Sequence, residues 1–80
     1  MRLTVLIRPK AGILDPQGEA VQASLATLGF AVTGARVGRL VELELDARDR
    51  ASAHAEAERM CHELLANPLI ESYVVVVAED

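Results

Sequence analysis

The chain has 80 residues, of which 51% are hydrophobic, and a formal net charge of −4 at pH 7. A chain of this length forms a single domain, assigned here to residues 1–80, and buries only about 60–65% of its unfolded surface, so part of the apolar content is expected at a subunit interface. The alternative is a tight monomer rich in Ala and Val. An acidic chain with one Phe, one Tyr and no Trp is a poor candidate for nucleic-acid binding, which uses basic surfaces and stacking rings.

Cysteine content and hydropathy predict a cytoplasmic protein. Cys61 is the single cysteine and cannot form an internal disulfide, which is typical of a reducing compartment. The apolar run near the N-terminus is too short for a signal peptide, and no segment approaches the roughly 18–20 apolar residues of a membrane span. We therefore expect no contact with a membrane.

Charge is distributed unevenly along the sequence. Residues 1–40 carry five cations and two acids (+3), whereas residues 41–80 carry three cations and ten acids (−7). This asymmetry favours contact between oppositely charged protein surfaces.

Residues 2–9 are predicted to form the first strand, because apolar and polar side chains alternate there until Pro9 ends the run. Asp15-Pro16 predicts a helix start: Asp15 can accept hydrogen bonds from the unpaired amides of the first turn, and Pro16 suits the first helical position. Gly18 in that turn costs up to about 1 kcal/mol relative to Ala. Either another backbone approaches it closely or the loop adjusts to the helix there, and both explanations remain open.

The helix that follows Asp15 has an apolar stripe that predicts one buried face. Gly29 is expected to end it in the left-handed conformation, with Phe30 folding back on the last turns. The stripe consists of Val21, Leu25 and Leu28.

Two further strands are expected over residues 31–37 and 40–45, joined as a hairpin at Gly38-Arg39. The second of them has the cleanest alternation in the chain. Its apolar face holds Val41, Leu43 and Leu45, and its polar face holds Glu42 and Glu44.

A second helix of roughly 16 residues follows from the helical spacing of its apolar side chains. Asp46 or Asp49 is expected to cap its start, and Asn67 in a left-handed conformation, followed by Pro68, is expected to end it. Its predicted buried face comprises Ala53, Ala57, Met60, Cys61, Leu64 and Leu65.

The last strand contains the unbroken β-branched run 74–77, which is typical of a strand buried on both faces. The element order is therefore βαββαβ, an α+β ferredoxin-like plait with two helices on one face of an antiparallel sheet. Such a sheet leaves its other face open. We expect the chain to cover that face by dimerising through the sheet or by exchanging its C-terminal strand.

Three groups of side chains resemble chemical sites, and a structural explanation is favoured for each. Cys61 and His62 point about 100° apart on a helix, and no other ligands have the spacing of a zinc site. Glu42 and Glu44 lie on a polar strand face, where nothing predicts the burial that acid–base catalysis requires. The segment that begins at Gly12 lacks the spacing of a phosphate loop. No catalytic, cofactor-binding or metal-binding residue is assigned.

Arg36 and Arg39 form a pair of cations at the expected hairpin. They can bind a phosphate group or the acids of a partner protein. The alternative is that they are ordinary exposed arginines at a turn, which need no partner.

Four motifs, spread in order over nearly the whole chain, indicate a family. They are GILDPQG at residues 12–18, Leu28-Gly29, Arg36-x-Gly38-Arg39, and LLANPxIExY at residues 64–73. In these motifs and in length the chain resembles the PurS family. Arg39 stands where the family usually has Lys, which keeps the charge but changes the donor geometry.

The resemblance implies a small non-catalytic subunit of phosphoribosylformylglycinamidine synthase, a ligase of purine biosynthesis. That complex converts formylglycinamide ribonucleotide, ATP and glutamine to formylglycinamidine ribonucleotide, ADP, phosphate and glutamate. The small subunit forms dimers or tetramers, joins a large synthetase subunit to a glutaminase subunit, assists ammonia transfer and needs no cofactor of its own. The residues expected at its partner interface are Asp15, Gln17, Gly18, Arg36, Gly38, Arg39, Asn67, Glu71 and Tyr73.

Two other classes of protein share the predicted element order. One is a small-molecule-binding regulatory domain of the ACT type, which an effector-induced rise in melting temperature would reveal. The other is a ferredoxin-like nucleic-acid module, although the aromatic pair such a module needs on its sheet is missing.

Overall fold

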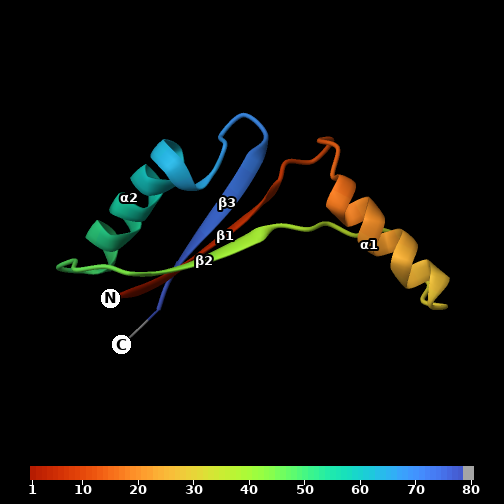
Figure 1. Ribbon diagram of the computed structural model, residues 1–80. Coiled ribbons are helices and arrows are strands. Elements are labelled where there is room, and N and C mark those ends of the chain that lie inside the picture. The colour runs from red at the N-terminus through yellow and green to blue at the C-terminus, as the bar shows by residue number, and fades with distance from the viewer. Residues whose placement is uncertain (79–80) are drawn as a thin grey trace.

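Three antiparallel strands and two helices make up the fold in the computed structural model, which describes residues 1–78 (Figure 1). A single π-helical turn, η1, extends the second helix. The elements are β1 (Arg2–Pro9), α1 (Pro16–Thr27), β2 (Arg39–Glu44), α2 (Arg50–Met60), η1 (Cys61–Leu65) and β3 (Glu71–Val77).

The sheet has the strand order β2-β1-β3, and both outer strands run antiparallel to β1. Its register places Leu6 of β1 opposite Leu40 of β2 and Val74 of β3. The α+β class and the antiparallel sheet expected from the sequence are confirmed.

The hydrophobic core lies between one face of the sheet and α2. The alternation predicted for β1 is confirmed, because its inward side chains are at most 2% exposed. Small side chains on α2 let the helix pack closely against them. The buried residues are Leu3, Val5, Ile7, Ala53, Ala57, Cys61 and Ala66, with Val41, Leu43 and Val75 packed beside them.

Helix α1 projects past the end of the sheet instead of lying on it (Figure 1). The chain is therefore elongated, with extents of 49 × 28 × 14 Å and a radius of gyration of 15.7 Å, against about 12 Å for a compact domain of this length. Within residues 1–78, α2 alone covers this face of the sheet, whereas both helices were expected to lie on it. The apolar stripe of α1 stays outside the core, with Val21 41% and Leu28 72% exposed.

The strand expected over residues 31–37, and its hairpin with the next strand, do not form, and this prediction is wrong. The segment lies along α1 instead, and α1 satisfies part of its backbone. Gln22 Nε2 donates to the carbonyl of Val32 (3.3 Å), and Asp15 accepts from the amide of Val37 (3.0 Å). The element order within the chain is accordingly βαβαβ.

The second helix begins as predicted, with Asp49 as the cap: its Oδ1 accepts from the amide of Ser52 at 2.8 Å. Together α2 and η1 span the expected length. The wider π turn rotates the following side chains, so Leu64 is 84% exposed instead of buried, and Ala66 takes the inward position. The left-handed conformation expected of Asn67 is also wrong, since every described non-glycine residue has negative φ.

The face of the sheet opposite α2 is not covered by any element of residues 1–78. Leu6 (43%), Leu40 (57%) and Val74 (54%) form one exposed apolar row across the three strands, hereafter the open-face row. Val76 is 48% exposed on the same face. Among residues 1–78, the run 74–77 is therefore covered on one face only, and the second cover expected from the sequence does not come from these residues.

Candidate partner-binding site

The residues expected at the partner interface gather at the end of the sheet that is nearest α1. There the last residues of β1 lie beside the start of β2 and the start of β3. The antiparallel pairing therefore brings together motifs that are about 30 residues apart in the sequence.

Asp15 joins α1 to the segment that precedes β2. Its Oδ1 accepts from the amide of Gly18 and its Oδ2 from the amide of Val37, both at 3.0 Å. The bond from Val37 lowers the pKa of the carboxyl most, followed by the bond from Gly18, and the charge of Arg36 lowers it further. The predicted helix cap is confirmed, and Asp15 also makes a tertiary contact that the local pattern did not indicate.

Gly18 is buried because the backbone of the same segment passes directly over it. A Cβ atom at this position would lie 2.5 Å from the carbonyl oxygen of Ala35 and 2.5 Å from Oδ2 of Asp15. The close-approach explanation for this glycine is therefore correct, and the approaching backbone belongs to the same chain.

Arg36 and Arg39 both donate to main-chain carbonyl groups of their own chain. Arg36 donates to the carbonyl of Pro9. Arg39 donates to the carbonyl of Leu65 at 2.7 Å and to Oε1 of Glu71 at 3.0 Å. These two arginines thus connect β1, η1 and β3 to the start of β2. They are therefore more than the ordinary exposed arginines that the sequence left as an alternative.

Glu71 organises the turn between η1 and β3. Besides Arg39, its Oε1 accepts from the amide of Asn67 at 2.7 Å, and this bond is the main cause of the lowered pKa of Glu71. The Oδ1 atom of Asn67 in turn accepts from the amide of Leu69 at 3.1 Å. The LLANPxIExY motif is therefore a hydrogen-bonded turn that positions the first residues of β3.

Tyr73 follows this turn and lies half-buried at the edge of the core. Its ring meets that of His62 edge-on, with centroids 6.1 Å apart. Burial raises the pKa of the Tyr73 phenol, and the charges of Glu58 and Cys61 raise it further.

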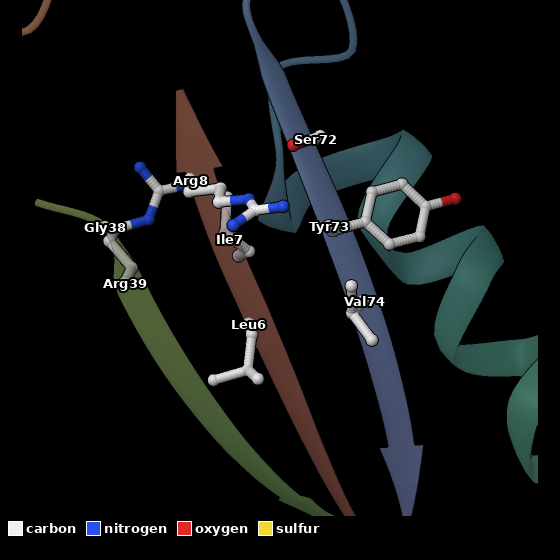
Figure 2. A pocket seen from close by; sticks show the side chains of 8 residues that line it. All are labelled: Leu6, Ile7, Arg8, Gly38, Arg39, Ser72, Tyr73 and Val74. Atoms are coloured by element: carbon white, nitrogen blue, oxygen red, sulfur yellow. The ribbon is translucent and has the colours of Figure 1, made fainter. Parts of the chain in front are cut away.

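Two hollows adjoin at this end of the sheet and share Gly38 and Arg39. One, of about 660 Å³, is also lined by Asp15, Gln17 and Glu71. The other, of about 430 Å³, is lined in part by Tyr73, as Figure 2 shows. Six of the nine expected interface residues line one hollow or the other, and the remaining three, Gly18, Arg36 and Asn67, contact or hydrogen-bond the segments that form their walls.

Sequence reasoning did not select Arg8 and Ser72, which line the smaller hollow. They occupy paired positions of β1 and β3. The sequence did contain a signal for them. Arg8 is two residues from Leu6 and Ser72 is two residues from Val74, so in a strand their side chains lie on the same face as those residues.

Cys61 and the two glutamates that were considered for metal binding or catalysis have the burial expected of them. Cys61 is fully buried, and burial raises the pKa of its thiol, with a further contribution from Glu58. Glu42 and Glu44 are exposed on the open face. Residues 1–78 contain no group of three or more metal-ligating side chains and no helix that is long and apolar enough to cross a membrane.

The family model described as PurS, phosphoribosylformylglycinamidine (FGAM) synthase, matches residues 2–79. The chain belongs to the PurS family. Its sequence is 45% identical over 73 residues to phosphoribosylformylglycinamidine synthase subunit PurS of Synechocystis sp., covering 90% of this chain and 71% of the relative. The resemblance drawn from the four motifs is confirmed.

Solved PurS structures share the fold. The PurS of Methanocaldococcus jannaschii, one of the subunits of formylglycinamide ribonucleotide amidotransferase, is 32% identical, with a TM-score of 0.89 covering 99% of this chain and 96% of that one. A chain in the structure of PurLQS from Thermotoga maritima is 29% identical, with a TM-score of 0.87 and coverage of 94% and 93%. Because the first match spans almost every residue, the projecting α1 is part of the shared PurS fold.

Proposed function

We propose that this PurS-family chain is the bridging subunit of phosphoribosylformylglycinamidine synthase in the cytoplasm. It holds the synthetase and glutaminase subunits together, assists ammonia transfer between them and contributes no catalytic residue. The reaction it supports converts formylglycinamide ribonucleotide, ATP and glutamine to formylglycinamidine ribonucleotide, ADP, phosphate and glutamate.

The observation that carries this proposal is the amount of apolar surface that the chain leaves uncovered. The open-face row and the stripe of α1 are both exposed, although each has the pattern of a buried face. Exposed apolar patches of this kind mark interaction surfaces. The membership of a similar chain in the Thermotoga maritima PurLQS structure supports an assembly role.

We further propose that the chain forms a homodimer or tetramer, with the open-face row at the interface between two copies. Two sheets can pack face to face at about 10 Å and interdigitate such rows. Sedimentation equilibrium at micromolar concentration should give a dimer or tetramer of the 8.6 kDa chain. A stable monomer would contradict self-association.

The assembly role is tested by reconstitution. The synthetase and glutaminase subunits are mixed, and glutamine-dependent formation of formylglycinamidine ribonucleotide is followed as this chain is added. We expect turnover to depend on the added chain, while the chain alone has no ATPase or glutaminase activity. Full glutamine-dependent turnover without it would show that the bridging role is wrong.

A further inference from the structure

The smaller hollow carries one arginine whose charge nothing in the described chain balances. Of the four cations near this end of the sheet, three donate to the chain's own carbonyl groups: Lys10 Nζ to Pro68 at 2.7 Å, Arg36 to Pro9, and Arg39 to Leu65 at 2.7 Å. The side chain of Arg8 makes no hydrogen bond or ion pair with any residue in 1–78. It is exposed and lines the hollow.

The two acids that line the adjoining hollow are already engaged in hydrogen bonds. Glu71 accepts from the amide of Asn67 and from Arg39, and Asp15 accepts from the amides of Gly18 and Val37. Neither carboxylate hydrogen-bonds or pairs with Arg8. No carboxylate among residues 1–78 pairs with Arg8, so its guanidinium group is available to an acid of another molecule.

Below Arg8 the hollow is apolar. Its wall includes Leu6 and Val74, which are 43% and 54% exposed, and the hydroxyl of Ser72 lies level with Arg8 on the neighbouring strand (Figure 2). A volume of about 430 Å³ admits side chains of a docking segment. The part of the hollow beyond the open-face row thus offers a place for one carboxylate, which the Arg8 guanidinium group can bind with two parallel hydrogen bonds.

We propose that the Arg8 corner of this hollow is the docking site for an acidic segment of a partner subunit of the synthase, which presents a carboxylate to Arg8 beside the hydroxyl of Ser72. The inference rests on the proposed bridging function and names the partner chemistry at that surface. It assigns recognition to Arg8, because Arg36 and Arg39, which the sequence singled out, are engaged in holding the fold.

A partner subunit fits this position better than a second copy of the chain. Arg8 and Ser72 lie about 7 Å beyond the open-face row along their strands. Twisted sheets that pack face to face meet best at their centres and diverge at their corners. A second copy that covers the open-face row therefore leaves the Arg8 corner accessible.

The test compares charge reversal at Arg8 with charge reversal at Arg48, an exposed arginine in the loop before α2 whose side chain pairs with no residue in 1–78. Wild type, R8E and R48E are each titrated into the synthetase and glutaminase subunits, and the half-saturation concentration of glutamine-dependent turnover is measured. We expect R8E to raise it tenfold or more, R48E to change it less than twofold, and R8K to fall between R8E and wild type. Raising the salt concentration should weaken wild type more than R8E.

Sedimentation and phosphate titrations distinguish the other occupants. R8E should keep the oligomeric state of wild type, and 10 mM phosphate at constant ionic strength should leave the half-saturation concentration unchanged. Equal values for R8E and R48E overturn the proposal. Dissociation of the R8E oligomer assigns the hollow to a second copy, and phosphate competition that depends on Arg8 assigns it to a small anion. If wild type itself does not bind the two subunits, the bridging function is what fails.

Discussion

Oδ2 of Asp15 accepts a hydrogen bond of 3.0 Å from the amide of Val37, which lies 22 residues later in the chain. This bond crosses from the start of α1 to the segment that enters β2. Since α1 does not lie on the sheet, its position depends on this contact and on the approach of the Ala35 carbonyl to Gly18. One carboxylate therefore caps a helix and orients it as well.

Replacing Asp15 with Ala should destabilise the chain more than the same change at Asp49. Both are helix caps, but Asp49 accepts only from its own first turn, whereas Asp15 also holds Val37. Loss of a simple cap lowers the melting temperature of a domain this size by about 4–8 °C, and Asp15→Ala should exceed that. Thermal unfolding by circular dichroism gives both values. Equal shifts would mean that the Val37 bond contributes nothing.

The same carboxylate predicts how stability depends on pH. Backbone hydrogen bonds lower the folded-state pKa values of Asp15, Asp49 and Glu71. The unfolded chain therefore binds protons more readily, and the stability these groups contribute, fully present above about pH 5, is lost as the pH falls through and below about 4. Urea unfolding between pH 3 and pH 7 should show this fall, and Asp15→Asn should reduce its slope. An identical slope for the variant would contradict the assignment to Asp15.

Gly18→Ala should destabilise the chain although alanine is the better helix former. The propensity gain of up to about 1 kcal/mol is outweighed, because the new methyl group would lie 2.5 Å from the backbone oxygen of Ala35. Gly34→Ala is the matched control, since nothing lies within 4 Å of its Cβ position. We expect a clear fall in melting temperature for the first variant and little change for the second. A Gly18→Ala variant as stable as wild type would show that the segment moves away freely.

Local patterns predicted most of this fold. The alternation in residues 2–9, the caps at Asp15 and Asp49 and the left-handed Gly29 all depend on near neighbours, and all are confirmed. The strand predicted over residues 31–37 does not form, because α1 hydrogen-bonds part of the backbone of this segment. Local periodicity does not encode such a contact. The predicted burial of Leu64 is wrong because a π-helical turn changes which side chains of the helix face the core.

The candidate site was also predicted only in part from the sequence. The motifs identified the residues that gather at the end of the sheet, but composition alone did not show that Arg36 and Arg39 would bind carbonyl groups of their own chain. An arginine at a polar position of an alternating strand, such as Arg8, gives no local signal of a binding role. Its significance comes from what its neighbours bind, which requires the structure.

Arg39 and Glu71 should show only weak coupling in a double-mutant cycle. Their side chains are 3.0 Å apart, but that of Arg39 is 53% exposed, so water screens the pair. We expect a coupling of about 0–1 kcal/mol between Arg39→Ala and Glu71→Ala, measured by urea unfolding. Arg39→Ala should still destabilise more than Arg48→Ala, because it also removes the bond to the carbonyl of Leu65. A coupling well above this range would show that the pair is shielded from water.

Leu6→Glu should dissociate the homo-oligomer. Leu6 lies at the centre of the open-face row, with Leu40 opposite on one side and Val74 on the other. A carboxylate there is solvated in the free chain, where Leu6 is already 43% exposed. In a face-to-face dimer the same carboxylate loses its water and meets its symmetry mate, and an unpaired buried charge is strongly unfavourable.

Leu64→Glu is the matched control for this change. Leu64 is 84% exposed on η1, which extends the helix on the opposite side of the sheet. Sedimentation equilibrium at micromolar concentration should therefore give a monomer for Leu6→Glu and the wild-type mass for Leu64→Glu, with circular dichroism showing that both variants are folded. A folded Leu6→Glu variant of wild-type mass would place the interface elsewhere. If Leu64→Glu dissociates instead, the copies meet through the helical side, and the open-face row remains free for the larger subunits.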